Sequence, residues 1–270
     1  MTVFRIAFKQ HIAGIIGWTV VISAMTGLLI FLHTLFAGSF SPDAFAARVN
    51  ALPALVRGIL GLSAVPDLSH DFQFTAYIYQ FILLFAGIYA GILGAKSLSG
   101  EEGRGTIEFL YSLPITRGSI LRQKTVSCVI SYILFSVLVY AATCVIIWVF
   151  NREMNISGIV IQLFRVYLCL LFIGLVYLSI GILVSALFRS NAESISVILA
   201  IVLITYIVGM MGNIMPHLNF LIYFSPVHAV LPLTTLNDGF NYIGLAIGLA
   251  VFVVFLILAN LRYKKKDFYV

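Results

Sequence analysis

Charged residues are scarce in this chain of 270 residues. Only 10% of the residues are Asp, Glu, Lys or Arg, whereas 61% are hydrophobic, and the mean hydropathy is +1.09. Soluble domains usually carry about 25% charged residues. The composition therefore excludes a soluble globular protein, and it predicts a single membrane domain, residues 1–270, with no soluble domain attached.

Cysteine is also rare. Cys128, Cys144 and Cys169 all fall within apolar stretches, where a thiol behaves as a small apolar side chain. The chain has no CxxC pair and no metal-ligand spacing. The sequence therefore predicts neither a disulfide framework nor a metal site.

Sequence signatures of catalysis are missing. The chain contains no HExxH sequence, no GxSxG sequence and no pair of carboxylates within its apolar stretches, which argues against an intramembrane protease or a serine hydrolase. It also lacks a GxxxxGK[ST] loop, since the nearest string, which begins at Gly94, has the wrong spacing. We therefore expect this chain to have no catalytic residue, to bind no cofactor and not to be an enzyme.

The apolar stretches also lack ionisable residues at their centres. Such residues usually mark ion or proton pathways, and ion-coupled transporters also tend to have spans interrupted by Gly and Pro. Here all seven prolines fall in predicted loops or at the ends of predicted spans. These absences argue against an ion-coupled secondary transporter.

Six apolar stretches are each long enough to cross a bilayer as a helix, because a core of about 30 Å requires about 20 residues. These lengths exceed those of the alternating strands of a β-barrel. The predicted fold is an all-α membrane protein with six transmembrane helices. Their approximate bounds are 14–36, 74–95, 125–150, 166–188, 194–215 and 239–261.

The positions of Lys and Arg predict the orientation, because basic residues are retained on the cytoplasmic side of a membrane. With both termini inside, only Arg48, Arg57, Arg152 and Arg165 of the sixteen Lys and Arg residues lie outside. The predicted location is a bacterial plasma membrane. The net charge of +6 then reflects topology and attraction to membrane lipids, and it requires no nucleic-acid partner.

The residues before the first span form an amphipathic pattern. Phe4, Phe8 and Ile12 recur at helical spacing, while Arg5 and Lys9 share another face. This pattern predicts an N-terminal helix in the membrane interface, and a simple charged flank is the alternative. The apolar run that follows is longer than the roughly 7 to 15 residues of a cleavable signal peptide, so we expect the first span to be retained.

Two GxxxG patterns occur, Gly87 to Gly91 in the second span and Gly244 to Gly248 in the last. Small residues at this spacing allow helices to approach closely. We interpret both as packing positions rather than as dimer-specific motifs.

The polar segment between the second and third spans, residues 96–124, carries most of the chain's distinctive chemistry. Ser99 and Glu102 form a capping-box pattern, which predicts a helix start at Ser99 or just after Gly105. Pro114 would end this short helix, and Thr116 is an N-cap candidate for a second helical run into the third span.

The short helix would have one apolar face, because Ile107, Leu110 and Tyr111 recur at helical spacing. Exposing such an apolar face to water is unfavourable, so we expect it to be covered. The pattern alone leaves two alternatives open, docking on a partner protein and docking on lipid headgroups.

The string EEGRGTIEFLYSLPITRGSILRQK resembles the motif that follows the second span in permeases of type-2 ATP-binding-cassette exporters. The outer segment 51–62, the segment FSPVHAV and the tail RYKKKDF also resemble parts of these permeases. Gly103 and Arg104 depart from the motif, since many relatives carry further acidic residues there. The matching positions are Glu101, Glu102, Gly105, Thr106, Glu108, Leu110, Leu113, Pro114, Thr116, Arg117 and Lys124.

The resemblance implies a transport subunit that works with separate cytoplasmic ATPase subunits, which would bind the ATP and Mg²⁺. It also implies a second permease, alike or different, so that the substrate pathway is formed by a dimer. The segment between the second and third spans would be the coupling helix, which contacts the ATPase. The residues expected to make this contact are Glu101, Glu102, Gly105, Thr106, Glu108, Leu110, Tyr111, Pro114 and Arg117.

The resemblance further implies that the second and fifth spans border the substrate pathway. The pathway residues predicted on this basis are Tyr77, Gln80, Tyr89, Thr205, Tyr206 and Met210. Because the spans lack charge at mid-depth, we expect an amphipathic or apolar cargo such as a peptide antibiotic, a drug or a lipid. An ATP-independent transporter or channel, and a non-transporting scaffold for an ATPase complex, remain alternatives.

Overall fold

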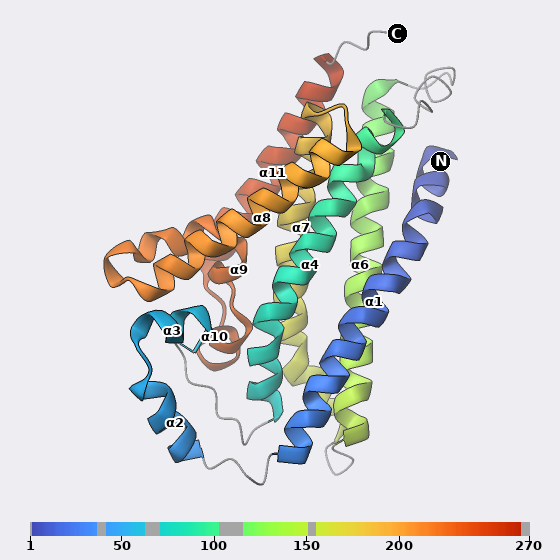
Figure 1. Ribbon diagram of the computed structural model, residues 1–270. Coiled ribbons are helices and arrows are strands. Elements are labelled where there is room, and N and C mark those ends of the chain that lie inside the picture. Colours follow the sequence, from blue (N-terminus) through green and yellow to red (C-terminus); the bar gives the residue numbers. More distant parts are fainter. Residues whose placement is uncertain (1, 37–41, 63–70, 103–115, 151–154, 266–270) are drawn as a thin grey trace.

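The protein is a bundle of long helices in the computed structural model (Figure 1). The structure describes all residues except 1, 37–41, 63–70, 103–115, 151–154 and 266–270. Every regular element within the described residues is a helix. Within that part of the chain, six helices are long and apolar enough to cross a membrane, which confirms the predicted fold class.

The six long helices follow the predicted order of spans, although several extend beyond the predicted bounds. Their bounds are α1 Thr2–Phe36, α4 Asp71–Glu102, α6 Arg117–Phe150, α7 Ile156–Leu187, α8 Asn191–Ile214 and α11 Tyr242–Lys265. The segment predicted to lie in the interface is helical and continues directly into the first span as part of α1. The fourth span begins ten residues earlier than predicted, because Asn155 caps α7 by accepting a hydrogen bond from the Ser157 amide.

Helices α4 and α7 form the centre of the bundle. In each, 72% of the most apolar stretch is buried inside the protein, whereas this share is at most 28% in the other four long helices. The backbones of α4 and α7 approach so closely that a Cβ at Gly94 would overlap the Leu178 carbonyl, and a Cβ at Gly181 would overlap the Gly91 carbonyl. Glycine therefore sets the distance between the two central helices.

The two GxxxG patterns are packing positions, as predicted. Gly87 and Gly91 of α4 lie against Tyr177 of α7 and Ile198 of α8. Gly244 and Gly248 of α11 lie against Ala229 and Phe172 in the same way. All four glycines make room for neighbours within this chain.

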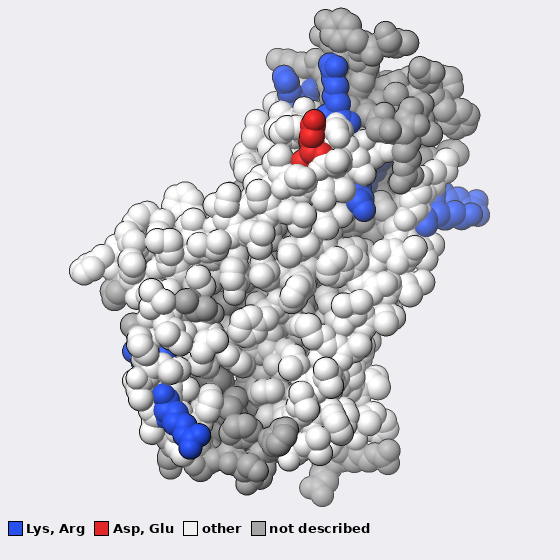
Figure 2. Space-filling model, in the orientation of Figure 1, with Lys and Arg blue, Asp and Glu red and all other residues white. Residues whose placement is uncertain are grey.

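The two ends of the bundle differ in charge (Figures 1 and 2). Both termini, the end of α4 and the turn between α7 and α8 lie at one end, where most of the Lys and Arg side chains gather; we call it the basic end. The short helices α2 Pro42–Ala51 and α3 Ala54–Ile59 lie toward the opposite end, which we call the α3 end.

The chain between α8 and α11 forms three short helices, η2 Pro216–Phe224, α9 Pro226–Ala229 and α10 Pro232–Asn237. The apolar pair His217–Phe224 and Pro226–Asn237 is bent by 107°, the geometry of a broken span or a re-entrant loop. The sequence interpretation placed this segment in an outer loop and missed the bent pair. A proline at the start of each short helix explains the breaks, because proline fits a first turn but not a helix interior.

Candidate functional site

The connection between α4 and α6, at the basic end, is the first candidate site. Glu101 and Glu102 lie in the last turn of α4, and Arg117 is the first residue of α6. The structure thus brings both ends of the predicted coupling segment to the basic end. The other predicted coupling residues, Gly105, Thr106, Glu108, Leu110, Tyr111 and Pro114, lie outside the described residues.

The predicted helix start at Ser99 is wrong, whereas the alternative start just after Gly105 lies outside the described residues. Helix α4 continues through Ser99 to Glu102, so Ser99 lies in the helix rather than at an N-cap. The Ser99 side chain is buried, and its hydroxyl donates back to the Ala95 carbonyl at 2.7 Å. The capping-box pattern failed because contacts with α7 keep α4 helical for about one more turn.

Those contacts form a cluster that we call the α4 clamp, made of Ser97, Leu98, Ser99, Lys124 and Ser185. The Ser185 hydroxyl of α7 accepts hydrogen bonds from the backbone amides of Leu98 and Ser99, each at 2.9 Å. From α6, the Lys124 ammonium donates to the Ser97 carbonyl at 2.8 Å. Both Lys124 and Ser185 are buried. The clamp therefore fixes the end of α4 to α6 and α7 together.

Helix α6 begins as the sequence predicts. The Thr116 carbonyl accepts hydrogen bonds from the Ser119 and Ile120 amides, at 2.9 and 3.1 Å. From there the helix continues without interruption to Phe150. The second helical run and the third span are thus one continuous helix.

Helix α1 is tied to α6 at the same end. The Phe4 amide donates to the Gln123 side chain at 3.4 Å, and the His11 ring bonds to the Ser131 hydroxyl at 3.0 Å. Helices α1, α4, α6 and α7 are therefore linked by hydrogen bonds near the connection.

The predicted pathway residues define the second candidate region. The structure does not bring them all together, but places them in three separate surroundings. Near the α3 end of α4, the Tyr77 hydroxyl donates to the Leu60 carbonyl at 3.0 Å. Gln80 lies beside Gly61, which has a φ of 65° and no room for a side chain. The segment that follows α3 therefore covers Tyr77 and Gln80.

Thr205 and Tyr206 of α8 face the segment between α8 and α11. The Thr205 hydroxyl lies 2.9 Å from the Tyr177 hydroxyl of α7, and the Tyr206 ring centroid lies 5.0 Å from that of His228. His228 is buried and bonds to the Ser225 hydroxyl at 3.0 Å. Met210 is half-buried on the same helix.

Thr205 also borders an apolar cavity of about 500 Å³. Helices α7, α8 and α11 form three of its walls, and the bent segment closes another. The lining residues are Val176, Ile180, Ile201, Thr205, Tyr223, Phe224, Pro226, Ala229, Gly244, Ile247, Gly248, Val251 and Phe255.

Tyr89 points elsewhere. Its ring lies 5.6 Å from that of Trp18 on α1 and 4.6 Å from that of Phe135 on α6. It is buried, and its hydroxyl has no hydrogen-bond partner among the described residues. The structure therefore does not bring Tyr89 together with Thr205 and Tyr206.

Sequence reasoning missed the part of this site that lies after α8. Phe224 and His228 belong to the segment FSPVHAV that resembles part of the permeases, but the sequence predicted no pathway role for Tyr223, Phe224 or His228. One signal was available, since residues 216–236 are mostly apolar and contain three prolines. That composition is typical of short helices buried in a membrane domain rather than of a solvated loop.

The described residues contain no group of three His, Cys, Asp or Glu side chains able to hold a metal ion. Four long apolar helices around two buried central ones, all within the part of the chain that the structure describes, define a multi-pass membrane protein. Residues 2–268, nearly the whole chain, match the family described as ABC-2 family transporter protein. The chain therefore belongs to the ABC-2 transporter family and is a permease-type membrane protein. No curated protein matches it.

Proposed function

We propose that this chain is the membrane-spanning permease subunit of an ATP-driven exporter. The basic end faces the cytoplasm, and a separate ATPase docks there on the connection between α4 and α6. The observation that carries this proposal is the α4 clamp, because it joins both helices that border the connection to the buried centre of the bundle. A scaffold or a passive channel would not need such a rigid junction.

The clamp suggests how work done by an ATPase reaches the membrane. A force on the connection acts on the end of α4, which is fixed to α7 by Ser185 and to α6 by Lys124. Helices α4 and α7 are the central, most buried pair, so they move as one body. The ATPase shifts the permease between conformations only to the extent that its contacts with the connection differ between them.

The orientation in this proposal rests on the distribution of charge. Most Lys and Arg side chains gather at the basic end, and Arg48 and Arg57 lie on α2 and α3 toward the other end. Basic residues are retained on the cytoplasmic side. Both termini and the connection would then lie in the cytoplasm, where ATP is available.

The apolar cavity beside Thr205 supports an amphipathic or apolar cargo. Its volume of about 500 Å³ is within the usual range for small-molecule sites, and its walls are almost entirely hydrophobic. The hydroxyl groups of Thr205 and Tyr177 provide one polar point in the wall. We further propose that a second permease, alike or different, completes the pathway.

The test is a transport measurement on the assembled complex. The full chain is purified with any ATPase that accompanies it, and ATP-dependent movement of a fluorescent amphiphile is measured in proteoliposomes. Glu108→Ala and Leu110→Ala are expected to lower the ratio of transport to ATP hydrolysis. Glu193→Ala is the matched control, because Glu193 is an exposed carboxylate at the start of α8 at the same end.

Three results would contradict the proposal in different ways. Unchanged coupling in an intact Glu108→Ala complex would refute the role of the connection. Transport driven by a gradient alone, without any ATPase, would identify a secondary transporter or channel. ATPase binding with no transport of any amphiphile would identify a scaffold.

A further inference from the structure

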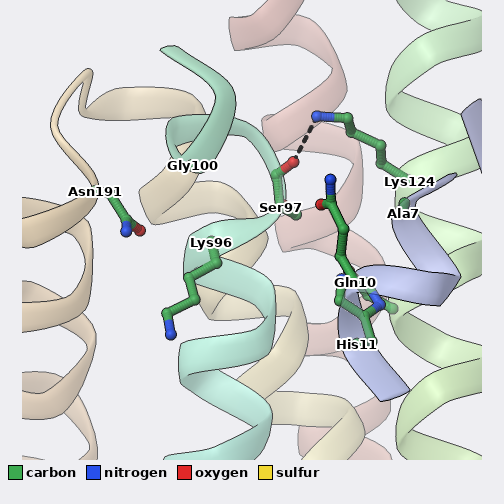
Figure 3. A pocket seen from close by; sticks show the side chains of 9 residues that line it. Ala7, Gln10, His11, Lys96, Ser97, Gly100, Lys124 and Asn191 are labelled. Carbon is green, nitrogen blue, oxygen red and sulfur yellow. Dashed lines mark hydrogen bonds between the residues drawn. The ribbon is translucent and has the colours of Figure 1, made fainter. Parts of the chain in front are cut away.

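A polar cavity lies at the basic end, next to the α4 clamp, with which it shares Ser97 and Lys124 (Figure 3). Its volume is about 150 Å³, and it is bordered by α1, α4, α6 and α8. The lining residues are Ala7, Gln10, His11, Lys96, Ser97, Gly100, Lys124, Cys128 and Asn191. Four helices that are distant in sequence thus contribute polar side chains to one small space.

The cavity is positively charged. Lys96 and Lys124 are among the residues that line it, and none of the described lining residues is acidic. Lys124 is only 3% exposed, and its ammonium donates to the Ser97 carbonyl, so its charge is fixed in position. Lys96 is exposed and is one of the lining residues on α4, and its side chain extends away from the Lys124 ammonium in Figure 3. An anion bound in the cavity would be attracted to both lysines, and Lys96 is long and exposed enough to turn toward it.

Two buried polar atoms at the cavity have no hydrogen-bond partner among the described residues. They are the hydroxyl oxygen of Ser97, a residue that is 8% exposed, and the side-chain oxygen of Asn191. Buried polar atoms are normally paired, so such atoms in a cavity wall indicate a missing partner. The Ser97 hydroxyl can donate to an anionic oxygen, and the Asn191 oxygen can accept from a hydroxyl.

A ligand that carries both negative oxygens and a hydroxyl would supply a partner for each of these atoms. A phosphate ester of a polyol has both, and its several oxygens suit donors that approach from four helices. A volume of about 150 Å³ corresponds to about five water molecules at 30 Å³ each, which is sufficient for such a group. The cavity lies toward the basic end of the long helices, so in a membrane-spanning bundle it would be close to the lipid headgroups.

We propose that the cavity between α1, α4, α6 and α8 binds the phosphate ester of a polyol, with Lys96 and Lys124 contacting the phosphate and Asn191 contacting the alcohol. Two sources share this chemistry, the headgroup of a glycerol phospholipid and a soluble polyol phosphate. The proposal does not depend on export, because binding requires neither an ATPase nor a cargo.

Binding is measured on the full chain in a neutral detergent. The probes are short-chain phosphatidylglycerol, short-chain phosphatidylcholine and glycerol 3-phosphate, each titrated while bound ligand is detected by native mass spectrometry. We expect phosphatidylglycerol to bind and phosphatidylcholine to bind at least about tenfold more weakly, because choline carries a positive charge and no hydroxyl. Competition by glycerol 3-phosphate identifies a soluble ligand, and its absence identifies a lipid headgroup.

Two variants distinguish the cavity from the general attraction of a basic surface. Lys96→Gln is expected to weaken binding about tenfold through loss of one charge-assisted contact. Lys9→Gln removes the same charge from an exposed position on α1, next to Gln10 but not in the cavity, and should change binding less than about twofold. Lys96 is exposed, so its replacement leaves the fold intact.

The proposal is overturned if neither phosphatidylglycerol nor glycerol 3-phosphate binds. It is also overturned if Lys96→Gln and Lys9→Gln weaken binding equally, since the effect would then come from the surface charge. Equal binding of phosphatidylglycerol and phosphatidylcholine would refute the assigned roles of Lys96 and Asn191.

Discussion

The ammonium of Lys124 on α6 lies 2.8 Å from the carbonyl oxygen of Ser97 on α4, across 27 residues of sequence. Lysine is rarely so deeply buried, and here its side-chain nitrogen donates a hydrogen bond to a backbone carbonyl of α4. This one contact joins the two helices that leave and re-enter the membrane domain around the coupling segment.

Lys124→Met should therefore weaken the protein and its coupling together. The substitution preserves the apolar stem but removes the donor, which should cost about 1.5–3 kcal/mol for a hydrogen bond from a charged group. Thermal unfolding in detergent measures the loss of stability. Lys264→Met, at an exposed position on α11 at the same end, is the control and should unfold close to wild type. Equal unfolding temperatures for the two variants would contradict the role of Lys124.

Ser185→Ala should uncouple ATP hydrolysis from transport. Without the hydroxyl, the Leu98 and Ser99 amides lose an acceptor, at a cost of about 1–3 kcal/mol. The end of α4 would then move independently of α7, so ATP hydrolysis should continue while transport per ATP falls. Ser196→Ala is the control, because its hydroxyl bonds only within α8 on an exposed face. A normal ratio of transport to hydrolysis in Ser185→Ala would show that the clamp transmits no work.

Gly181→Ala should destabilise the central helix pair. An added methyl group would overlap the Gly91 carbonyl of α4. A backbone carbonyl in a helix cannot move aside as the end of a flexible side chain can. Overpacking usually costs about 1–3 kcal/mol, and we expect a value at the upper end of that range. Gly17→Ala on α1 meets nothing within 4 Å and should be neutral or stabilising. Denaturant titration of both variants measures the difference, and similar midpoints would refute the close approach.

Val251→Trp should block the apolar cavity beside Thr205. Val251 borders the cavity, so an indole would occupy much of its volume, and cargo transport should fall about tenfold. Val253→Trp is the matched control, because Val253 lies two residues after Val251 on α11 and is 52% exposed. Transport of the fluorescent amphiphile is the measurement. If Val253→Trp reduced transport as strongly as Val251→Trp, the cavity would have no specific part in the pathway.

Several features of the site could be predicted from the sequence because their signals are local. Thr116 precedes α6 as its helix-start pattern indicated, and Gly87 and Gly91 provide the predicted packing surface. The start predicted at Ser99 failed because its side chain and amide are used in packing against α7. A local pattern does not reveal that a neighbouring helix supplies the acceptor.

The sequence by itself determined that this chain crosses a membrane in six helices, because span length and hydropathy depend only on consecutive residues. The tertiary structure alone decided that α4 and α7 are central, that Tyr89 turns toward α1 and α6, and that residues 216–237 bend back as short helices. Lipid and protein interior are both apolar, so a hydrophobic side chain does not encode which of them it will contact. That choice depends on close backbone approach at Gly94 and Gly181, and on buried hydrogen bonds between helices distant in sequence.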